Sequence, residues 1–225
     1  MAAWEGPAYP SAADVAASEP LFDAAVAYVR GLPGRGDARL QPVAQEERLA
    51  YYGLFKAATV GPTPGKRPGM LNLEGQYKYD AWFVLQQLPA PTARAVYVDL
   101  CATTMLVHRV ASSGHRAHQD EVIQQGGPPS AFAKKVLESD VSSQPRMWRL
   151  AREFAAAVEK ASGGGGPPKD KPMLDALFWQ AVVGDVFVQK PSLAARALGA
   201  TGINVDGWHA WQALKGKTKD WAMRE

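Results

Sequence analysis

The stretch Tyr51–Trp82 reads YYGLFKAATVGPTPGKRPGMLNLEGQYKYDAW, and the expected fold can be worked outward from it. Its first part has helical spacing: Tyr52 lies four residues before Lys56, so the two side chains are neighbours on one helix face. Glycines and prolines then crowd residues 61–69, and a regular helix cannot continue through them. A helical pattern resumes near Glu74. The stretch therefore predicts a helix–loop–helix unit.

Basic and aromatic residues gather on both sides of this loop: Tyr52, Lys56, Lys78, Tyr79 and Trp82. Lysine ammonium groups form charge-assisted hydrogen bonds to phosphate, and aromatic faces stack on bases. The unit therefore suits a ligand with phosphates and an aromatic ring. Taken one by one, the same residues have plainer interpretations, since either lysine could be solvated and Tyr52 could be a half-buried core ring.

Three motifs within this stretch carry a family resemblance: KAATVG, then RPGML, then GQYKYDAW. In that order and at that spacing they resemble the acyl-CoA-binding protein family, over a match from about Phe22 to Thr103. The resemblance implies an all-α fold, a four-helix bundle in up-down-down-up order with its ligand in a surface bowl. It also implies a fatty acyl-CoA ligand and no cofactor.

The helical patterns of the first half agree with a small bundle, because apolar stripes alternate with Pro/Gly breaks. The four helices are expected at about Glu19 to Leu32, Pro42 to Val60, Glu74 to Leu88, and from just after Pro91 to Val110.

The resemblance also nominates ligand-binding residues, which are Tyr52, Lys56, Lys78, Tyr97, Arg30 and Tyr79. Tyr97 falls where the family places a ligand-contacting tyrosine of the fourth helix, although its sequence context alone would make it a core residue. Arg30 stands where relatives often carry a basic residue near the phosphates, and a plain surface role is equally open. Tyr79 replaces the family's usual tryptophan but keeps a flat aromatic face, so altered packing is expected rather than lost binding.

Composition bounds the remaining possibilities. The chain has 225 residues, 47% hydrophobic and 21% charged, which is ordinary for a globular protein, and its net charge of +3 argues against broad nucleic-acid binding. No uninterrupted apolar run reaches the roughly 20 residues of a membrane span, and the first residues lack the pattern of a secretory signal. The single cysteine, Cys101, fits a reducing compartment, so a cytoplasmic location is expected.

The second half echoes the first. REFAAAVEKASGGGG parallels PLFDAAVAYVRGLPG, DALFWQAVVGD parallels YGLFKAATVGP, and WHAWQALKGKTKDWAM parallels the stretch that begins YDAWFVLQQL. This pattern predicts a divergent second repeat. The two repeats differ at the candidate ligand-binding positions. Lys56, Tyr52 and Lys78 of the first repeat are replaced in the second by Trp179, Asp175 and Gly207, in that order. No counterpart of Tyr97 is expected.

The expected organisation has four parts: a flexible arm at 1–18, an acyl-CoA-binding domain at 19–112, a linker with one short helix at 113–145, and a C-terminally shortened repeat at 146–225. His115 and His118 fall in the linker, where they are interpreted as solvated side chains and not as metal ligands.

Three functions compete. The first is a non-enzymatic intracellular carrier or pool former for long-chain fatty acyl-CoA, favoured because no nucleophile–base pair or carboxylate dyad has a recognisable spacing. The second is an acyl-CoA-sensing scaffold whose residues 146–225 dock a partner protein. The third is a CoA-thioester enzyme, for which the remaining chain offers no catalytic module.

Overall fold

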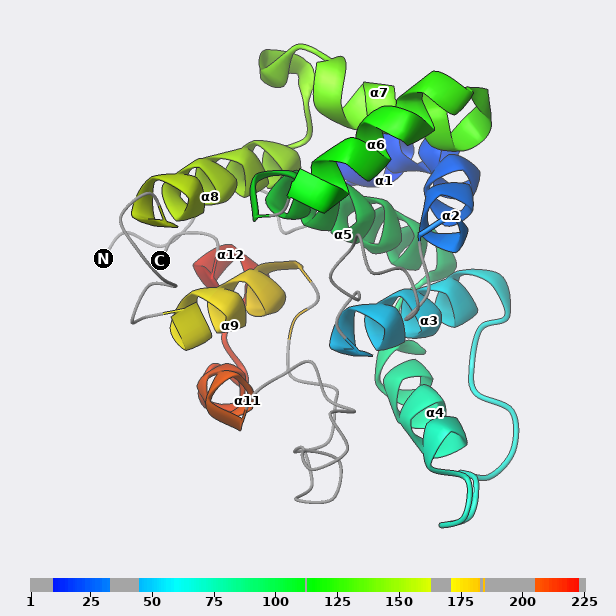
Figure 1. Cartoon of the computed structure of the whole chain (residues 1–225). Coiled ribbons are helices and arrows are strands. Elements are labelled where there is room, and N and C mark those ends of the chain that lie inside the picture. The colour runs from blue at the N-terminus through cyan, green and yellow to red at the C-terminus, as the bar shows by residue number, and fades with distance from the viewer. Residues whose placement is uncertain are drawn as a thin grey trace. The chain divides into compact units, whose positions relative to one another are not determined.

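The structure is a computed structural model (Figure 1). It describes residues 10–32, 45–111, 113–162, 171–182, 184 and 205–222. Every regular element in these ranges is a helix. The elements are α1 (Ala12–Ser18), the 3₁₀ helix η1 (Glu19–Leu21), α2 (Phe22–Arg30), α3 (Gln45–Thr59), α4 (Leu73–Leu85), α5 (Ala90–Ala111), α6 (Ser113–Gln125), α7 (Gly127–Glu138), the 3₁₀ helix η2 (Val141–Ser143), α8 (Arg146–Ser162), α9 (Lys171–Val182), α11 (Val205–Ala213) and α12 (Lys219–Ala222). The expected all-helical class is confirmed for the described ranges.

The four helices predicted for the first half correspond to α2, α3, α4 and α5. The fourth begins at Ala90, so Pro91 lies inside its first turn, where a proline has no hydrogen bond to lose. The predicted start of the second helix at Pro42 lies outside the described residues.

Two helices lie where none was predicted. In the segment expected to be an arm, α1 is capped by a reciprocal pair: the backbone N–H of Ser11 donates to Asp14 at 2.9 Å, and that of Asp14 donates to Ser11 Oγ at 3.2 Å. In the segment expected to be a linker, α6 buries polar residues. Gln119 is one of them, and its Nε2 donates to Met105 O at 3.0 Å. Because this buried face is polar, hydrophobic periodicity does not reveal α6.

The chain divides into two compact units. Unit 1 comprises Met1–Val15, Val43–Val96 and Lys169–Glu225; unit 2 comprises Ala16–Pro42 and Tyr97–Pro168. Each unit thus combines segments from both halves of the sequence, and α5 contributes its first residues to unit 1 and the rest to unit 2. The predicted domain boundaries at 112 and 145 remain a prediction.

The core of unit 2 is aromatic. The ring of Phe132 on α7 lies 6.0 Å from Tyr28 of α2 and 6.5 Å from Trp148 of α8. The indole N–H of Trp148 donates to Asp99 Oδ1 on α5 at 2.7 Å, with both residues buried. This hydrogen bond compensates for the burial of two polar groups away from water.

Unit 1 contains two helix hairpins, α3–α4 and α9–α11, and in each the two helices pack on one another. The first approach is close because Gly53 faces α4: a Cβ there would lie 2.7 Å from Ala81 O. No helix in the described ranges is both long and apolar enough to cross a membrane.

Candidate functional site

The best-defined feature of unit 1 is the turn that ends α3. Gly61 has a φ of +87°, which favours glycine, and its N–H donates to Lys56 O at 3.1 Å. Its carbonyl accepts a hydrogen bond from the indole N–H of Trp82 at 2.7 Å. This bond fixes the Trp82 ring against the last turn of α3. The ammonium group of Lys56 lies 4.7 Å from the centre of that ring, within the range of a cation–π contact.

The second lysine of the predicted site lies over the first tyrosine. Lys78 Nζ is 5.7 Å from the centre of the Tyr52 ring and 2.6 Å from Glu74 Oε1. The hydrogen bond from Lys78 is the main cause that lowers the pKa of Glu74. One side of the α3–α4 hairpin therefore carries Tyr52, Lys56 and Lys78. Trp82 lies on the same side, with its ring against the Lys56 ammonium group.

The loop between the two helices is fastened to α4 by several side chains. The guanidinium of Arg67 forms two hydrogen bonds of 2.6 Å to the carboxylate of Asp80, and this raises the pKa of Arg67. Gln86 Oε1 accepts from the backbone N–H of Thr63 at 2.8 Å, and Gln76 Nε2 donates to Pro68 O at 3.0 Å. Sequence reasoning missed the pair of Arg67 and Asp80. Both residues lie within the quoted motifs, RPGML and GQYKYDAW, but their spacing does not show that they meet.

Tyr79 has partners of its own. Its ring stacks on Phe83 with centroids 5.9 Å apart and planes 15° apart, and its hydroxyl donates to Gly65 O at 3.4 Å. Tyr79 thus contacts the loop through its hydroxyl and Phe83 through its ring. The packing change expected for a tyrosine in this place stays a prediction.

The remaining two predicted residues, Tyr97 and Arg30, belong to unit 2. Tyr97 is buried, with its ring edge-on to Phe22 at 5.3 Å, and burial strongly raises the pKa of its hydroxyl. Arg30 is exposed, and its positive charge lowers the pKa of the Tyr97 hydroxyl. The guanidinium therefore lies near the phenol. The ligand role of all six residues stays a prediction.

The α9–α11 hairpin has the same turn geometry as α3–α4. Gly184 has a φ of +108°, its N–H donates to Trp179 O at 3.2 Å, and its carbonyl accepts from Trp211 Nε1 at 2.9 Å. In the first hairpin Lys56 lies over the ring of Trp82. The second hairpin has Trp179 in the place of that lysine, and its ring stacks on Trp211 with ring centres 5.7 Å apart and planes 29° apart. The carbonyl and indole are 27 residues apart here and 21 in the first hairpin, in agreement with a longer loop.

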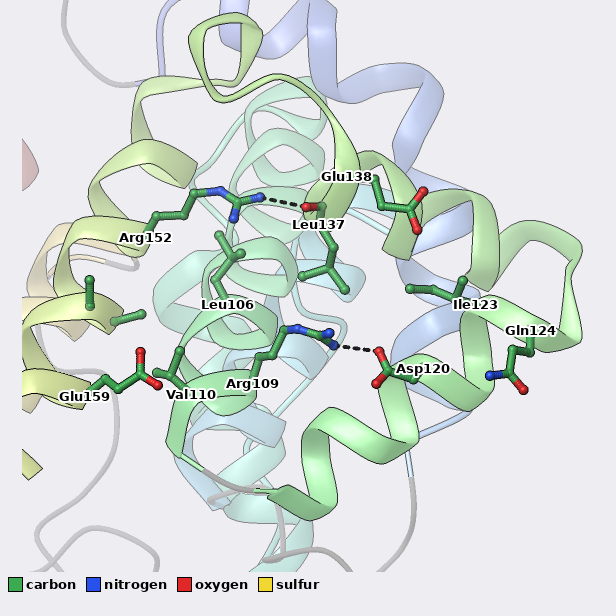
Figure 2. A pocket seen from close by; sticks show the side chains of 12 residues that line it. Leu106, Arg109, Val110, Asp120, Ile123, Gln124, Leu137, Glu138, Arg152 and Glu159 are labelled. Atoms are coloured by element: carbon green, nitrogen blue, oxygen red, sulfur yellow. Dashed lines mark hydrogen bonds and ion pairs between the residues drawn. The ribbon is translucent and has the colours of Figure 1, made fainter. Parts of the chain in front are cut away.

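Unit 2 also contains a pocket of about 530 Å³ between α5, α6, α7 and α8 (Figure 2). Arg109 extends across it and donates to Asp120 Oδ1 at 2.9 Å. Arg152 enters from α8 and donates to Leu137 O at 3.4 Å (Figure 2). Its Nε also donates to Gln144 Oε1 at 2.9 Å. Since one wall of the pocket is α6, a helix that the sequence did not predict, sequence reasoning had no means of finding it.

The histidines of the expected linker are not all solvated, so that prediction is wrong for His115. It is buried on α6, with its ring centre 4.6 Å from that of His108 on α5. Burial lowers the pKa of both side chains to about 4, with their mutual repulsion adding to the shift for His115. Both are neutral at pH 7. The described part of the chain has no group of three or more potential ligands placed to hold a metal ion.

Comparison with known proteins gives a family match within the first half of the chain. The family model described as "Acyl CoA binding protein" matches residues 19–101. Acyl-CoA-binding domain-containing protein 5 of Xenopus tropicalis is 40% identical over 78 residues, which are 35% of this chain and 16% of that protein. Acyl-CoA-binding domain-containing protein 2 of Oryza sativa subsp. japonica is 43% identical over 56 residues, 25% of this chain and 62% of that protein.

A third relative has an enzyme's name. Enoyl-CoA delta isomerase 2 of Rattus norvegicus is 39% identical over 69 residues, 31% of this chain and 18% of that protein. The match to each of these three relatives spans less than two thirds of the relative's length. No solved structure matches the chain. The chain thus carries an acyl-CoA-binding protein domain at residues 19–101.

Proposed function

We propose that the domain at residues 19–101 binds long-chain fatty acyl-CoA esters, and that the protein is an intracellular carrier or pool former that does no chemistry on them. One observation carries this proposal. Three of the nominated residues, Tyr52, Lys56 and Lys78, lie on one side of the α3–α4 hairpin beside Trp82. All of them fall within the residues that match the family.

Lys56 is the residue best placed to bind a phosphate. Its ammonium group lies over the Trp82 ring, and no carboxylate pairs with it among the residues that the structure describes. A cation held in this way keeps its charge available to an anion. A charge-assisted hydrogen bond to a phosphate contributes about 1.5–3 kcal/mol.

The second lysine would need to exchange partners. Lys78 already pairs with Glu74, and both side chains are exposed. Exposed ion pairs contribute roughly 0–1 kcal/mol, so a phosphate could replace the carboxylate at little cost. The tyrosine faces would then be available for the adenine ring, where base–aromatic stacking contributes about 1–3 kcal/mol.

The acyl chain would supply much of the affinity. Each methylene group removed from water stabilises a complex by about 0.8 kcal/mol, so a long chain outweighs any single head-group contact. Contacts to the phosphates and adenine would set specificity for coenzyme A, and chain length would set most of the strength.

Non-catalytic action is supported by the family match and by how little of the enzyme is shared. The family model that matches residues 19–101 is that of a binding protein, and the match to the isomerase relative covers only 18% of that protein's length. The activity in its name belongs to that protein. A cytoplasmic location is part of the proposal, since the single cysteine, Cys101, cannot form a disulfide within the chain.

We further propose that residues 146–225 are a second, divergent copy of the acyl-CoA-binding unit that has lost its phosphate site. The shared turn of Gly61 and Gly184, each with a tryptophan indole on its carbonyl, supports this. Where the first turn carries Lys56 above its tryptophan, the second carries Trp179. A stacked indole pair is stable without a ligand and offers no charge to a phosphate.

The test is a titration of palmitoyl-CoA into the intact protein and into Lys56→Met, with Lys134→Met as control. Lys134 is an exposed lysine of α7 in unit 2. Loss of one charge-assisted contact predicts an affinity about tenfold to a hundredfold lower for Lys56→Met and unchanged for the control. Equal affinities for all three proteins would contradict the assignment of Lys56.

A further inference from the structure

The loop between α3 and α4 ends in a cluster of exposed apolar side chains. Met70 is 86% exposed, Leu71 105% and Leu73 61%, and these three residues are called the apolar tip below. Single exposed apolar residues are common and need no explanation. Three within four consecutive positions, at the turn into α4, form a local apolar projection that water solvates poorly.

The apolar tip is held in place by the loop around it. Asn72 caps α4 by accepting from the backbone N–H of Gly75 at 2.9 Å, and the N–H of Asn72 donates to Gly69 O at 3.0 Å. On the approach to the tip, Pro68 O accepts from Gln76 and Arg67 pairs with Asp80. Because the backbone is already ordered, seating the tip in another phase costs little further conformational entropy.

The charged residues of the loop that carries the apolar tip are positive. Between residues 60 and 73 the only charged residues are Lys66 and Arg67, and Glu74, which follows the tip, is paired with Lys78. Lys66 is exposed and forms no ion pair with any residue that the structure describes, whereas Arg67 is paired with Asp80. The loop thus presents apolar side chains next to a solvated, uncompensated cation.

We propose that the apolar tip inserts into the surface of an anionic phospholipid bilayer. Met70, Leu71 and Leu73 would enter the boundary between head groups and acyl chains, and Lys66 would lie against the anionic head groups. Amphipathic surface elements bind membranes through this combination of buried apolar area and electrostatic attraction. The inference goes beyond acyl-CoA binding and requires no bound ligand.

A bilayer fits the apolar tip better than a protein partner does. Specific protein–protein interfaces bury about 800 Å² on each partner, far more than three side chains at a loop tip provide. The next exposed apolar residues, Phe83 and Val84, lie ten or more positions further along α4. At a rise of about 1.5 Å per residue that is roughly 15 Å from Leu73, which is too far to extend the patch.

The experiment is flotation of the intact, ligand-free protein with vesicles of phosphatidylcholine, with and without phosphatidylserine. We expect binding to the vesicles that contain phosphatidylserine and much weaker binding to the neutral ones. Leu71→Ser should reduce the partition coefficient by about tenfold, because one fully exposed leucine no longer leaves water. Lys66→Glu should reduce it by at least about fivefold, and added salt should weaken wild-type binding.

The control is Val141→Ser, which removes a 46% exposed apolar side chain from η2 in unit 2 and should leave binding unchanged. None of these side chains is buried, so far-UV circular dichroism should show all variants folded. The inference is overturned if the ligand-free wild type does not float, or if Val141→Ser loses as much binding as Leu71→Ser. It is also overturned if Leu71→Ser abolishes a concentration-dependent dimer and leaves flotation unchanged.

Discussion

The substitution Trp82→Phe tests the turn on which the candidate site depends. In the folded protein the Trp82 indole donates to Gly61 O at 2.7 Å, and its ring lies beneath Lys56 with the ammonium 4.7 Å from the ring centre. Phenylalanine keeps an aromatic ring and removes the N–H donor. The change therefore separates the hydrogen bond from most of the aromatic packing.

The loss of stability can be worked out from these contacts. The acceptor is only partly buried, so losing its hydrogen bond costs about 1 kcal/mol. Trp82 itself is buried, and a smaller ring leaves a gap worth roughly another 1 kcal/mol. A weaker cation–π contact adds about 0.5 kcal/mol at most. We expect Trp82→Phe to lower the free energy of unfolding by about 2–3 kcal/mol in total.

Urea unfolding followed by far-UV circular dichroism measures this difference. The matched control is Trp221→Phe, since the Trp221 indole is half-buried and donates to no residue in the described part of the chain. That control should lose less than about 1 kcal/mol. If Trp82→Phe loses no more than the control does, the indole–carbonyl bond does not hold the turn and the reasoning fails.

Two further predictions concern packing and pH. Gly53→Ala should lower the free energy of unfolding by about 1–2 kcal/mol, because the new Cβ would clash with Ala81 O and the gain in helix propensity offsets only part of that clash. The control is Gly69→Ala, which has open space around it and should change the free energy of unfolding by under about 0.5 kcal/mol. Both values come from urea unfolding, and equal losses would contradict the close approach of α3 and α4. The pKa of His108 and His115 is about 4 in the folded protein against an ordinary 6.5, so between these pH values the unfolded chain binds more protons and stability falls as the pH falls. Unfolding across that range should show this slope, and the double variant His108→Gln/His115→Gln should flatten it; an unchanged slope would refute the assignment.

Much of the first half could be predicted from sequence because its signals are local. Glycines and prolines at 61–69 mark the end of α3, and the spacing of Tyr52 and Lys56 places both on one helix face. The Arg67–Asp80 pair was missed, although both residues lie inside the motifs, because a charge pair across a loop depends on the loop's path rather than on any periodicity.

The middle of the chain shows why a polar composition misleads. Residues 113–125 have no apolar stripe, so they were interpreted as linker, yet they form α6. The helix is stabilised by polar contacts such as Gln119 to Met105 O, and it buries His115 in its neutral form. Such contacts depend on partners from another helix, which no local pattern in the sequence can reveal.

The most direct test of the central claim is an isothermal titration of palmitoyl-CoA into the intact protein, which reports affinity and stoichiometry together. The proposed function predicts saturable binding of one ligand per chain, because the turn at Gly184 carries Trp179 where the first turn carries Lys56. Two equivalent sites would contradict the loss of the phosphate site in the second half. No binding at all would contradict the carrier function.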